Sequence, residues 1–128
     1  MKYLLDTQVL IWAVENPQKL GARAAEIIRD AANELLVSKV SVWELAIKLA
    51  LGKLGLKIPL RDFMQAHVFP AGIRVLNVEL EHIFRLQTLP LHHRDPFDRI
   101  LIAQSLVEGF PLISGDASLS AYPIEIIN

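Results

Sequence analysis

Short apolar runs alternate along this chain with longer segments in which apolar residues recur at helical spacing. This alternation is typical of a parallel β-sheet covered by helices, because a strand that is buried on both faces is apolar throughout. Five runs are predicted to be strands: residues 3–5, 35–37, 74–76, 112–113 and 124–127. Between them we predict six helices: residues 7–15, 21–33, 41–51, 60–68, 79–88 and 96–108.

Glycine and proline residues mark the ends of these elements. Gly52 follows the third predicted helix as the glycine that ends it, and Asp95 and Pro96 supply the N-cap and first position of the last helix. The other six prolines all fall between the predicted elements. The chain of 128 residues fits one compact domain, so we predict a single α/β domain over 1–128.

Composition narrows the class of protein. No apolar run approaches the ~20 residues that span a bilayer, and the first residues do not resemble a signal peptide, so we expect a cytoplasmic protein without a membrane segment. There are no cysteines, which excludes disulfides and thiolate metal sites. Thirteen basic and fourteen acidic side chains give a net charge of −1, so any site for nucleic acid has to be local.

Acidic residues follow the predicted strands where those strands end. Asp6 comes directly after the first strand, and Asp116 follows the fourth. Glu44 lies in the first turns of the helix after the second strand, while Asp95 and Asp98 begin the helix before the fourth. The carboxyl ends of parallel strands share one edge, so we expect these five carboxylates to meet there.

Carboxylates that meet at one edge repel each other unless cations lie among them. Oxygen ligands suit Mg²⁺ or Mn²⁺, and ions of this kind can hold an attacking water and a departing oxygen around a phosphodiester. The pattern therefore indicates a metal-dependent hydrolase of nucleic acid. Zinc is disfavoured, because none of the four histidines form a pair with zinc-ligand spacing: His67, His82, His92 and His93.

Most of these acids also have a purely structural interpretation. Asp95 before a proline is an ordinary N-cap, and Asp116 after a glycine is an ordinary turn residue. Glu44 and Lys48 are spaced for an exposed ion pair on a helix. Asp6 is harder to explain in this way, because its charge directly follows what should be the central buried strand.

Four segments together carry a resemblance to a known family. They are LLDTQVLIW at 4–12, SVWELAIKLALGKL at 41–54, LPLHHRDPFDRILIAQ at 89–104 and LISGDASLSAY at 112–122. With these segments the chain resembles PIN-domain proteins of the VapC type, nearly from end to end. The resemblance implies a three-layer α/β/α sandwich with a mainly parallel sheet of four to five strands. It also implies a Mg²⁺- or Mn²⁺-dependent endoribonuclease, the toxin of a toxin–antitoxin pair, which acts on RNA, binds a cognate antitoxin and forms a homodimer.

The family's residue roles transfer by position. Asp6, Glu44 and Asp98 match the acidic triad that holds metal, and Asp116 matches a fourth, less uniform acid. Asp95 belongs to the same motif without a settled role. Two hydroxyl residues, Thr7 and Ser114, match positions that orient Asp6 and Asp116 or a metal-bound water, or else cap a helix or turn. The chain departs from the family pattern at Gly115, where a larger, often basic residue is expected.

Basic and apolar side chains near the acids have two interpretations each. Four basic residues are predicted either to contact phosphates or to form a solvated rim: Lys48, Lys53, Arg94 and Arg99. We treat His92 and His93 as polar loop residues rather than general bases. An apolar set is either a groove for an antitoxin helix or part of the core: Trp43, Leu49, Leu51, Leu54 and Leu56.

Other classes of α/β protein fit less well. A phospho-acceptor receiver domain needs adjacent acids after its first strand, whereas Thr7 follows Asp6, and it needs a late lysine, whereas none occurs after Lys57. A haloacid-dehalogenase-like phosphatase needs an aspartate where Gln8 stands. Two alternatives stay open: a PIN fold that serves only as an interaction module, and a DNA nuclease, whose metal chemistry would be the same.

Overall fold

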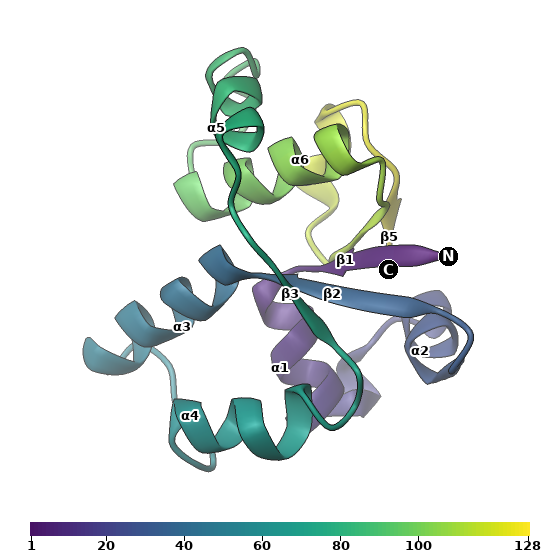
Figure 1. Ribbon diagram of the computed structural model, residues 1–128, viewed down its shortest axis with the longest axis vertical. Helices are drawn as coiled ribbons and strands as arrows, with labels where there is room; N and C mark the ends of the chain where they lie inside the picture. The colour runs from purple at the N-terminus through teal and green to yellow at the C-terminus, as the bar shows by residue number, and fades with distance from the viewer.

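The computed structural model describes residues 1–128 as a five-stranded sheet between two layers of helices (Figure 1). All four strand pairs are parallel, and the strand order is β3-β2-β1-β4-β5. This confirms the predicted α/β class and the mainly parallel sheet. The strands are β1 (Lys2–Leu5), β2 (Glu34–Ser38), β3 (Arg74–Leu76), β4 (Leu112–Ile113) and β5 (Ile126–Ile127).

Helices cover both faces of the sheet. In Figure 1 the first four α-helices lie on one side of the strands and the last two on the other, which makes the three layers of an α/β/α sandwich. They are α1 (Thr7–Glu15), α2 (Ala22–Arg29), α3 (Lys39–Ala50), α4 (Leu60–Phe63), α5 (Leu80–Gln87) and α6 (Pro96–Glu108). Three short turns of other helix types complete the chain: η1 (Pro17–Lys19), η2 (Met64–Val68) and η3 (Ala117–Ala121).

The central strand β1 separates two hydrophobic cores. Tyr3 and Leu5 pack into the core beneath α1, α3 and α4, whereas Leu4 packs into the core beneath α6. Successive side chains of a strand point to opposite faces, so a strand with a core on each side has no polar positions. This is why the strands appear in the sequence as uniformly apolar runs.

The predicted boundaries differ from the observed ones where polar side chains cap an element. The second helix ends at Arg29 rather than at 33, because the Asp30 side chain accepts a hydrogen bond from the Ala32 amide and turns the chain. The third begins at Lys39 rather than at 41, because Ser38 Oγ accepts from the Val40 amide. The last strand is only residues 126–127.

The sheet brings segments from both ends of the chain to one edge. The amide of Asp6 donates to the carbonyl of Ile113 at 3.0 Å, and the amide of Ser114 donates to Ile127 at 2.9 Å. The residues that follow β1 and β4 therefore start side by side. None of the helices has both the length and the apolar character needed to cross a bilayer.

Candidate active site

A cleft of about 210 Å³ lies at the carboxyl edge of the sheet, with room for several water molecules at roughly 30 Å³ each. It brings together all five carboxylates that the sequence singled out, together with one lysine. The other lining residues are Thr7, Gln8, Ile11 and Leu54. The charged side chains of the cleft are Asp6, Glu44, Lys48, Asp95, Asp98 and Asp116.

Asp6 is buried at the floor of this cleft as the N-cap of α1. Its Oδ1 accepts a hydrogen bond from the Val9 amide at 2.7 Å, and only 8% of the residue is exposed. Burial raises the pKa of Asp6 to about 6, against the opposing hydrogen bonds of the Ser114 hydroxyl and the Val9 amide. The sequence prediction that Ser114 orients a site carboxylate fits this contact with Asp6.

Glu44 is held from both sides on α3. Thr7 Oγ1 donates to its Oε1 at 2.7 Å, and Lys48 Nζ lies 2.7 Å from its Oε2. The expected pair with Lys48 forms, but the expectation of an exposed pair is wrong for Glu44, which is 5% exposed because α3 faces the cleft there. The Thr7 hydroxyl orients Glu44, rather than Asp6 as the sequence suggested.

Lys48 is the only cation of the chain that lines the cleft. Its hydrogen bond to Glu44 raises the pKa of the Lys48 ammonium, although partial burial acts in the opposite direction. The ammonium is therefore held in its charged form. One lysine against five carboxylates leaves most of the negative charge in the cleft uncompensated.

Asp95 and Asp98 begin α6 and differ in what holds them. Asp95 Oδ1 accepts from the amides of Phe97 at 2.8 Å and Asp98 at 3.3 Å, so its N-cap role is real even though it also lines the cleft. Asp98 Oδ2 lies 2.8 Å from Nε2 of His93. Burial raises the pKa of Asp98, while the hydrogen bond from His93 opposes this shift.

Asp116 enters the cleft from the loop after β4. The Ser118 hydroxyl donates to its Oδ1 at 2.6 Å and the Ser118 amide at 3.0 Å, and the hydroxyl contact is the main reason why the pKa of Asp116 is lowered. A Cβ on Gly115 would lie 3.2 Å from Cζ3 of Trp12. The ring of Trp12 thus occupies the space where a larger residue at 115 was expected.

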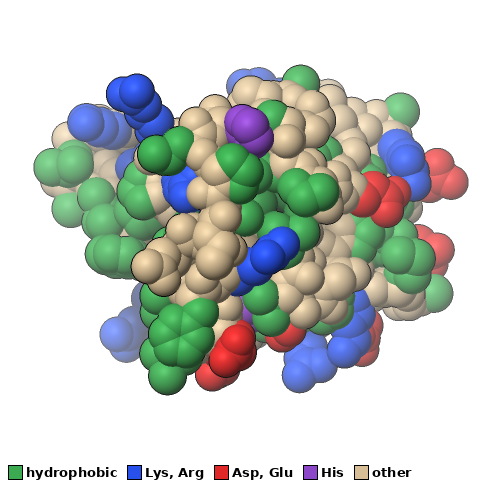
Figure 2. Space-filling model, turned by 90° about the horizontal axis from the view of Figure 1, so that it is seen from above, with side chains coloured by type: hydrophobic (Ala, Val, Ile, Leu, Met, Phe, Trp, Pro, Cys, Tyr) green, Lys and Arg blue, Asp and Glu red, His purple; other side chains and the backbone are tan.

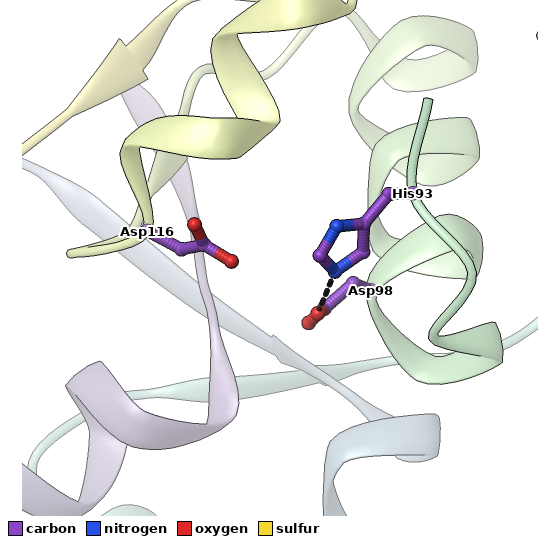
Figure 3. A group of neighbouring side chains, drawn as sticks. All are labelled: His93, Asp98 and Asp116. Atoms are coloured by element: carbon purple, nitrogen blue, oxygen red, sulfur yellow. Dashed lines mark hydrogen bonds and ion pairs between the residues drawn. The ribbon is translucent and has the colours of Figure 1, made fainter. Parts of the chain in front are cut away.

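His93, expected from the sequence to be only a polar loop residue, lies at the site. Its imidazole lies beside Asp98 and faces Asp116, and the three can each present a ligand atom within 4.8 Å of the others (Figure 3). The spacing of apolar residues, which reveals helices and strands, gives no information on the role of a residue in a loop such as His93. The signal available in the sequence was its position inside the histidine-rich segment 89–104.

Arg99, expected either to contact phosphates or to belong to a solvated rim, does not line the cleft. Its guanidinium donates to five acceptors that surround the loop between α5 and α6: the carbonyls of Leu86, Leu89, Pro90 and His93 and the hydroxyl of Tyr122. A guanidinium with this many partners has a structural role, because it holds the backbone of the loop in one conformation. The other basic residues near the acids, Lys53 and Arg94, are exposed.

The apolar set expected to form one groove is divided by the fold. Leu49 and Leu56 line a surface groove with Ile58 and Leu60, whereas Leu54 lines the acidic cleft. Trp43 packs edge-on against Phe97, with ring centroids 5.4 Å apart, and remains 61% exposed. The face over α5 and α6 also shows hydrophobic side chains between lysine and arginine side chains (Figure 2).

The donor set of the cleft fits a divalent cation. Carboxylate oxygens are the ligands that hard divalent ions prefer, and the raised pKa values of Asp6 and Asp98 reflect carboxylates that lie where water cannot fully solvate their charge. The carboxylates also come from rigid positions, because helix caps and serine or threonine hydroxyls hold four of them.

Comparison with known proteins gives the same picture. The model of the PIN domain family matches residues 3–125. The chain is 30% identical to ribonuclease VapC22 of Mycobacterium tuberculosis over 93% of its length and 90% of that protein. Its fold superposes on a chain in the crystal structure of VapBC2 from Rickettsia felis bound to a promoter DNA fragment, with a TM-score of 0.72 and 13% identity over 100% of this chain and 98% of that one. It also superposes on a chain in the crystal structure of FitAcB from Neisseria gonorrhoeae, with a TM-score of 0.69 and 18% identity over 100% of this chain and 97% of that one. A third similar fold is in a toxin–antitoxin complex from Klebsiella pneumoniae, with a TM-score of 0.62 and 16% identity over 98% of this chain and 96% of that one. The chain therefore belongs to the PIN domain family, and within it to the VapC-type ribonucleases.

Proposed function

We propose that this protein is a divalent-metal-dependent endoribonuclease that serves as the toxin of a toxin–antitoxin pair. The observation that carries the proposal is the convergence of five carboxylates, two of them with raised pKa values, in one cleft of a PIN fold. Asp6, Glu44, Asp98 and Asp116 would hold Mg²⁺, or Mn²⁺ in its place. Asp95 would act mainly through the helix start that it caps.

A bound ion of this kind would supply a polarised phosphodiester and a reactive water. The side chains do the positioning. Thr7 fixes one oxygen of Glu44, the Val9 amide fixes one oxygen of Asp6, and Ser118 fixes Asp116. These contacts fix the direction of each carboxylate, which lowers the reorganisation needed to bind metal and substrate.

RNA is the substrate class that the relationship to VapC-type ribonucleases supports. The chain has no overall positive charge, so its contacts to the RNA backbone have to come from local basic side chains. Arg94 directly precedes the cleft residue Asp95, and Lys53 directly precedes Leu54, and both are exposed. An enzyme of this kind would act on cellular RNA in the cytoplasm.

Two protein partners belong to the proposal. The structural relatives include toxin–antitoxin complexes, which supports a cognate antitoxin for this chain. The groove lined by Leu49, Leu56, Ile58 and Leu60 offers such an antitoxin an apolar surface for the hydrophobic face of a helix. The exposed apolar side chains of Trp43 and of helix α5 similarly support a homodimer.

The experiment is cleavage of a mixed structured-RNA pool by antitoxin-free protein in Mg²⁺, Mn²⁺ or EDTA, with DNA as a second substrate. Asp6→Asn and Asp98→Asn are compared with Glu26→Gln, an exposed acid on α2, after circular dichroism has shown that all three fold. We expect metal-dependent RNA cleavage that the first two variants lose and the third retains. Full activity in both aspartate variants, or cleavage of DNA alone, would contradict the proposal, and no cleavage in any metal would favour the interaction module.

A further inference from the structure

The loop between α5 and α6 places an imidazole at the cluster of carboxylates. Nε2 of His93 lies 2.8 Å from Oδ2 of Asp98 on α6, and Figure 3 shows the ring beside Asp98 and facing Asp116 on the loop after β4. Ligand atoms of the three side chains lie within 4.8 Å of one another. Ligands about 2.1 Å from an octahedral ion stand about 3.0 Å apart when adjacent and about 4.2 Å apart when opposite, so the three side chains have to close toward one another when they bind one ion.

The backbone of this loop is held in place independently of the carboxylates. The hydroxyl of Tyr122 accepts a hydrogen bond from the His93 amide at 3.0 Å and donates to the carbonyl of Pro90 at 2.9 Å. The guanidinium of Arg99 donates to the carbonyls of both residues. A loop that carries a metal ligand has to be preorganised, and these four hydrogen bonds fix the backbone on both sides of His92.

We propose that His93 is a metal ligand of this protein, contributing Nε2 alongside carboxylate oxygens of Asp98 and Asp116. The inference rests on the proposed function, which needs a divalent ion in the same cleft. Coordination uses the lone pair of Nε2, so a bound ion would replace the present contact between Nε2 and Oδ2 of Asp98.

A nitrogen ligand changes which ion the site favours. Mg²⁺ takes oxygen ligands almost exclusively, whereas Mn²⁺ lies in the transition series whose ions also bind imidazole. His93 therefore strengthens the binding of Mn²⁺ more than that of Mg²⁺. Replacing His93 is therefore expected to lower the affinity for Mn²⁺ more than the affinity for Mg²⁺. If His93 had only a structural role in the loop, its replacement would lower both affinities equally.

The test uses the full-length protein labelled with ¹⁵N-histidine and loaded with Mn²⁺, read by pulsed electron paramagnetic resonance. We expect a ¹⁵N coupling to the manganese in the unmodified protein, lost in His93→Gln and kept in His92→Gln. His92 is the matched control, because it lies in the same loop, is exposed and contacts Tyr122 through ring packing at 5.1 Å. Calorimetry is expected to show about a 10–100-fold loss of Mn²⁺ affinity in His93→Gln and a smaller loss for Mg²⁺.

Asp98→Asn separates a failure of this inference from a failure of the proposed function. Suppose that Mn²⁺ binds the unmodified protein, that Asp98→Asn abolishes this binding, and that no ¹⁵N coupling is seen. The metal centre is then supported and the role of His93 as a ligand is refuted. Equal losses of Mn²⁺ and Mg²⁺ affinity in His93→Gln would refute it as well. If Mn²⁺ does not bind the unmodified protein at all, the metal centre and the histidine ligand are both wrong.

Discussion

Lys48 Nζ lies 2.7 Å from Oε2 of Glu44, so the chain itself supplies one cation to a cleft whose other charged side chains are all carboxylates. Glu44 is buried, whereas the side chain of Lys48 is 45% exposed. The lysine can therefore move into solvent at little cost when another cation enters. Its ammonium offsets part of the repulsion between the acids until then.

Replacing Lys48 by Ala tests this view. We expect a loss of stability of about 1–2 kcal/mol in EDTA, because the buried carboxyl group of Glu44 loses one of its two partners. At saturating Mg²⁺ or Mn²⁺ we expect RNA cleavage to fall far less than in Asp98→Asn. Urea unfolding and cleavage assays measure the two effects, and Lys48→Met controls for the packing of the lysine stem. An activity loss as large as that of Asp98→Asn would assign Lys48 to the chemistry itself.

The raised pKa of Asp6 predicts how stability changes with pH in EDTA. Between the unfolded pKa near 4 and the folded pKa of about 6, the folded protein binds more protons at Asp6 than the unfolded chain does. Stability from this group is therefore full below pH 4 and declines as pH rises through 6, by up to about 3 kcal/mol. The contribution of Asp6 to the stability of the metal-free protein is therefore smaller at pH 7 than at pH 4.

Asp6→Asn isolates that contribution, because asparagine is also a good N-cap and carries no charge. In EDTA we expect the variant to be more stable than the unmodified protein at pH 7 and about equally stable at pH 4, measured by urea unfolding. Subtracting the two pH profiles removes the other titrating groups, such as Asp98 and Asp116, whose pKa values shift in opposite directions. A difference that does not depend on pH would show that the pKa of Asp6 is not raised in the folded protein.

Arg99 predicts a structural rather than a substrate-binding phenotype. Arg99→Lys keeps the charge but cannot serve the five acceptors that the planar guanidinium reaches, so we expect a loss of about 2–3 kcal/mol. Arg94→Lys, at an exposed position in the same segment, is expected to change stability by less than about 0.5 kcal/mol. A stable Arg99→Lys protein with weakened RNA binding would reverse the assignment.

Gly115 predicts a packing conflict with Trp12. In Gly115→Ala the new Cβ lies 3.2 Å from Cζ3 of the tryptophan, so the ring has to shift by a few tenths of an ångström. We expect a cost of about 1 kcal/mol in unfolding experiments, and more for Gly115→Val. Trp12→Leu makes room, so the same alanine substitution has to cost less in that background; equal costs in both backgrounds would show that the contact is not the cause.

The sequence was sufficient for the fold because each element carries its own local signal. The strands are uniformly apolar, and Asp95, Pro96 and Gly52 mark helix ends by rules that depend on few neighbours. Gly52 does adopt the positive φ of 70° that a glycine after a helix provides. The shortened second helix was missed because the capping that ends it depends on side-chain contacts of Asp30 and Asn33.

The candidate site, too, has features that could be predicted from the sequence and features that could not. The convergence of the carboxylates follows from parallel strands sharing one edge, so it was predictable from spacing alone. The directions of individual side chains were not. Arg99 turns away from the acids and His93 turns toward them, and both orientations depend on Tyr122, which lies far along the chain in sequence. Contacts of this kind arise only once the loop, α6 and η3 have packed together.

The packing of Trp12 against Gly115 also gives the protein an internal optical probe. The chain has two tryptophans, and the other, Trp43, is mostly exposed on a different face. In a Trp43→Phe background the fluorescence comes from Trp12 alone, whose Cζ3 lies 3.2 Å from where a Cβ on Gly115, the residue before Asp116, would stand. Any ligand that repositions the Asp116 loop has to change the surroundings of that indole, so occupancy of the cleft becomes readable as an emission change in real time, without radioactive RNA.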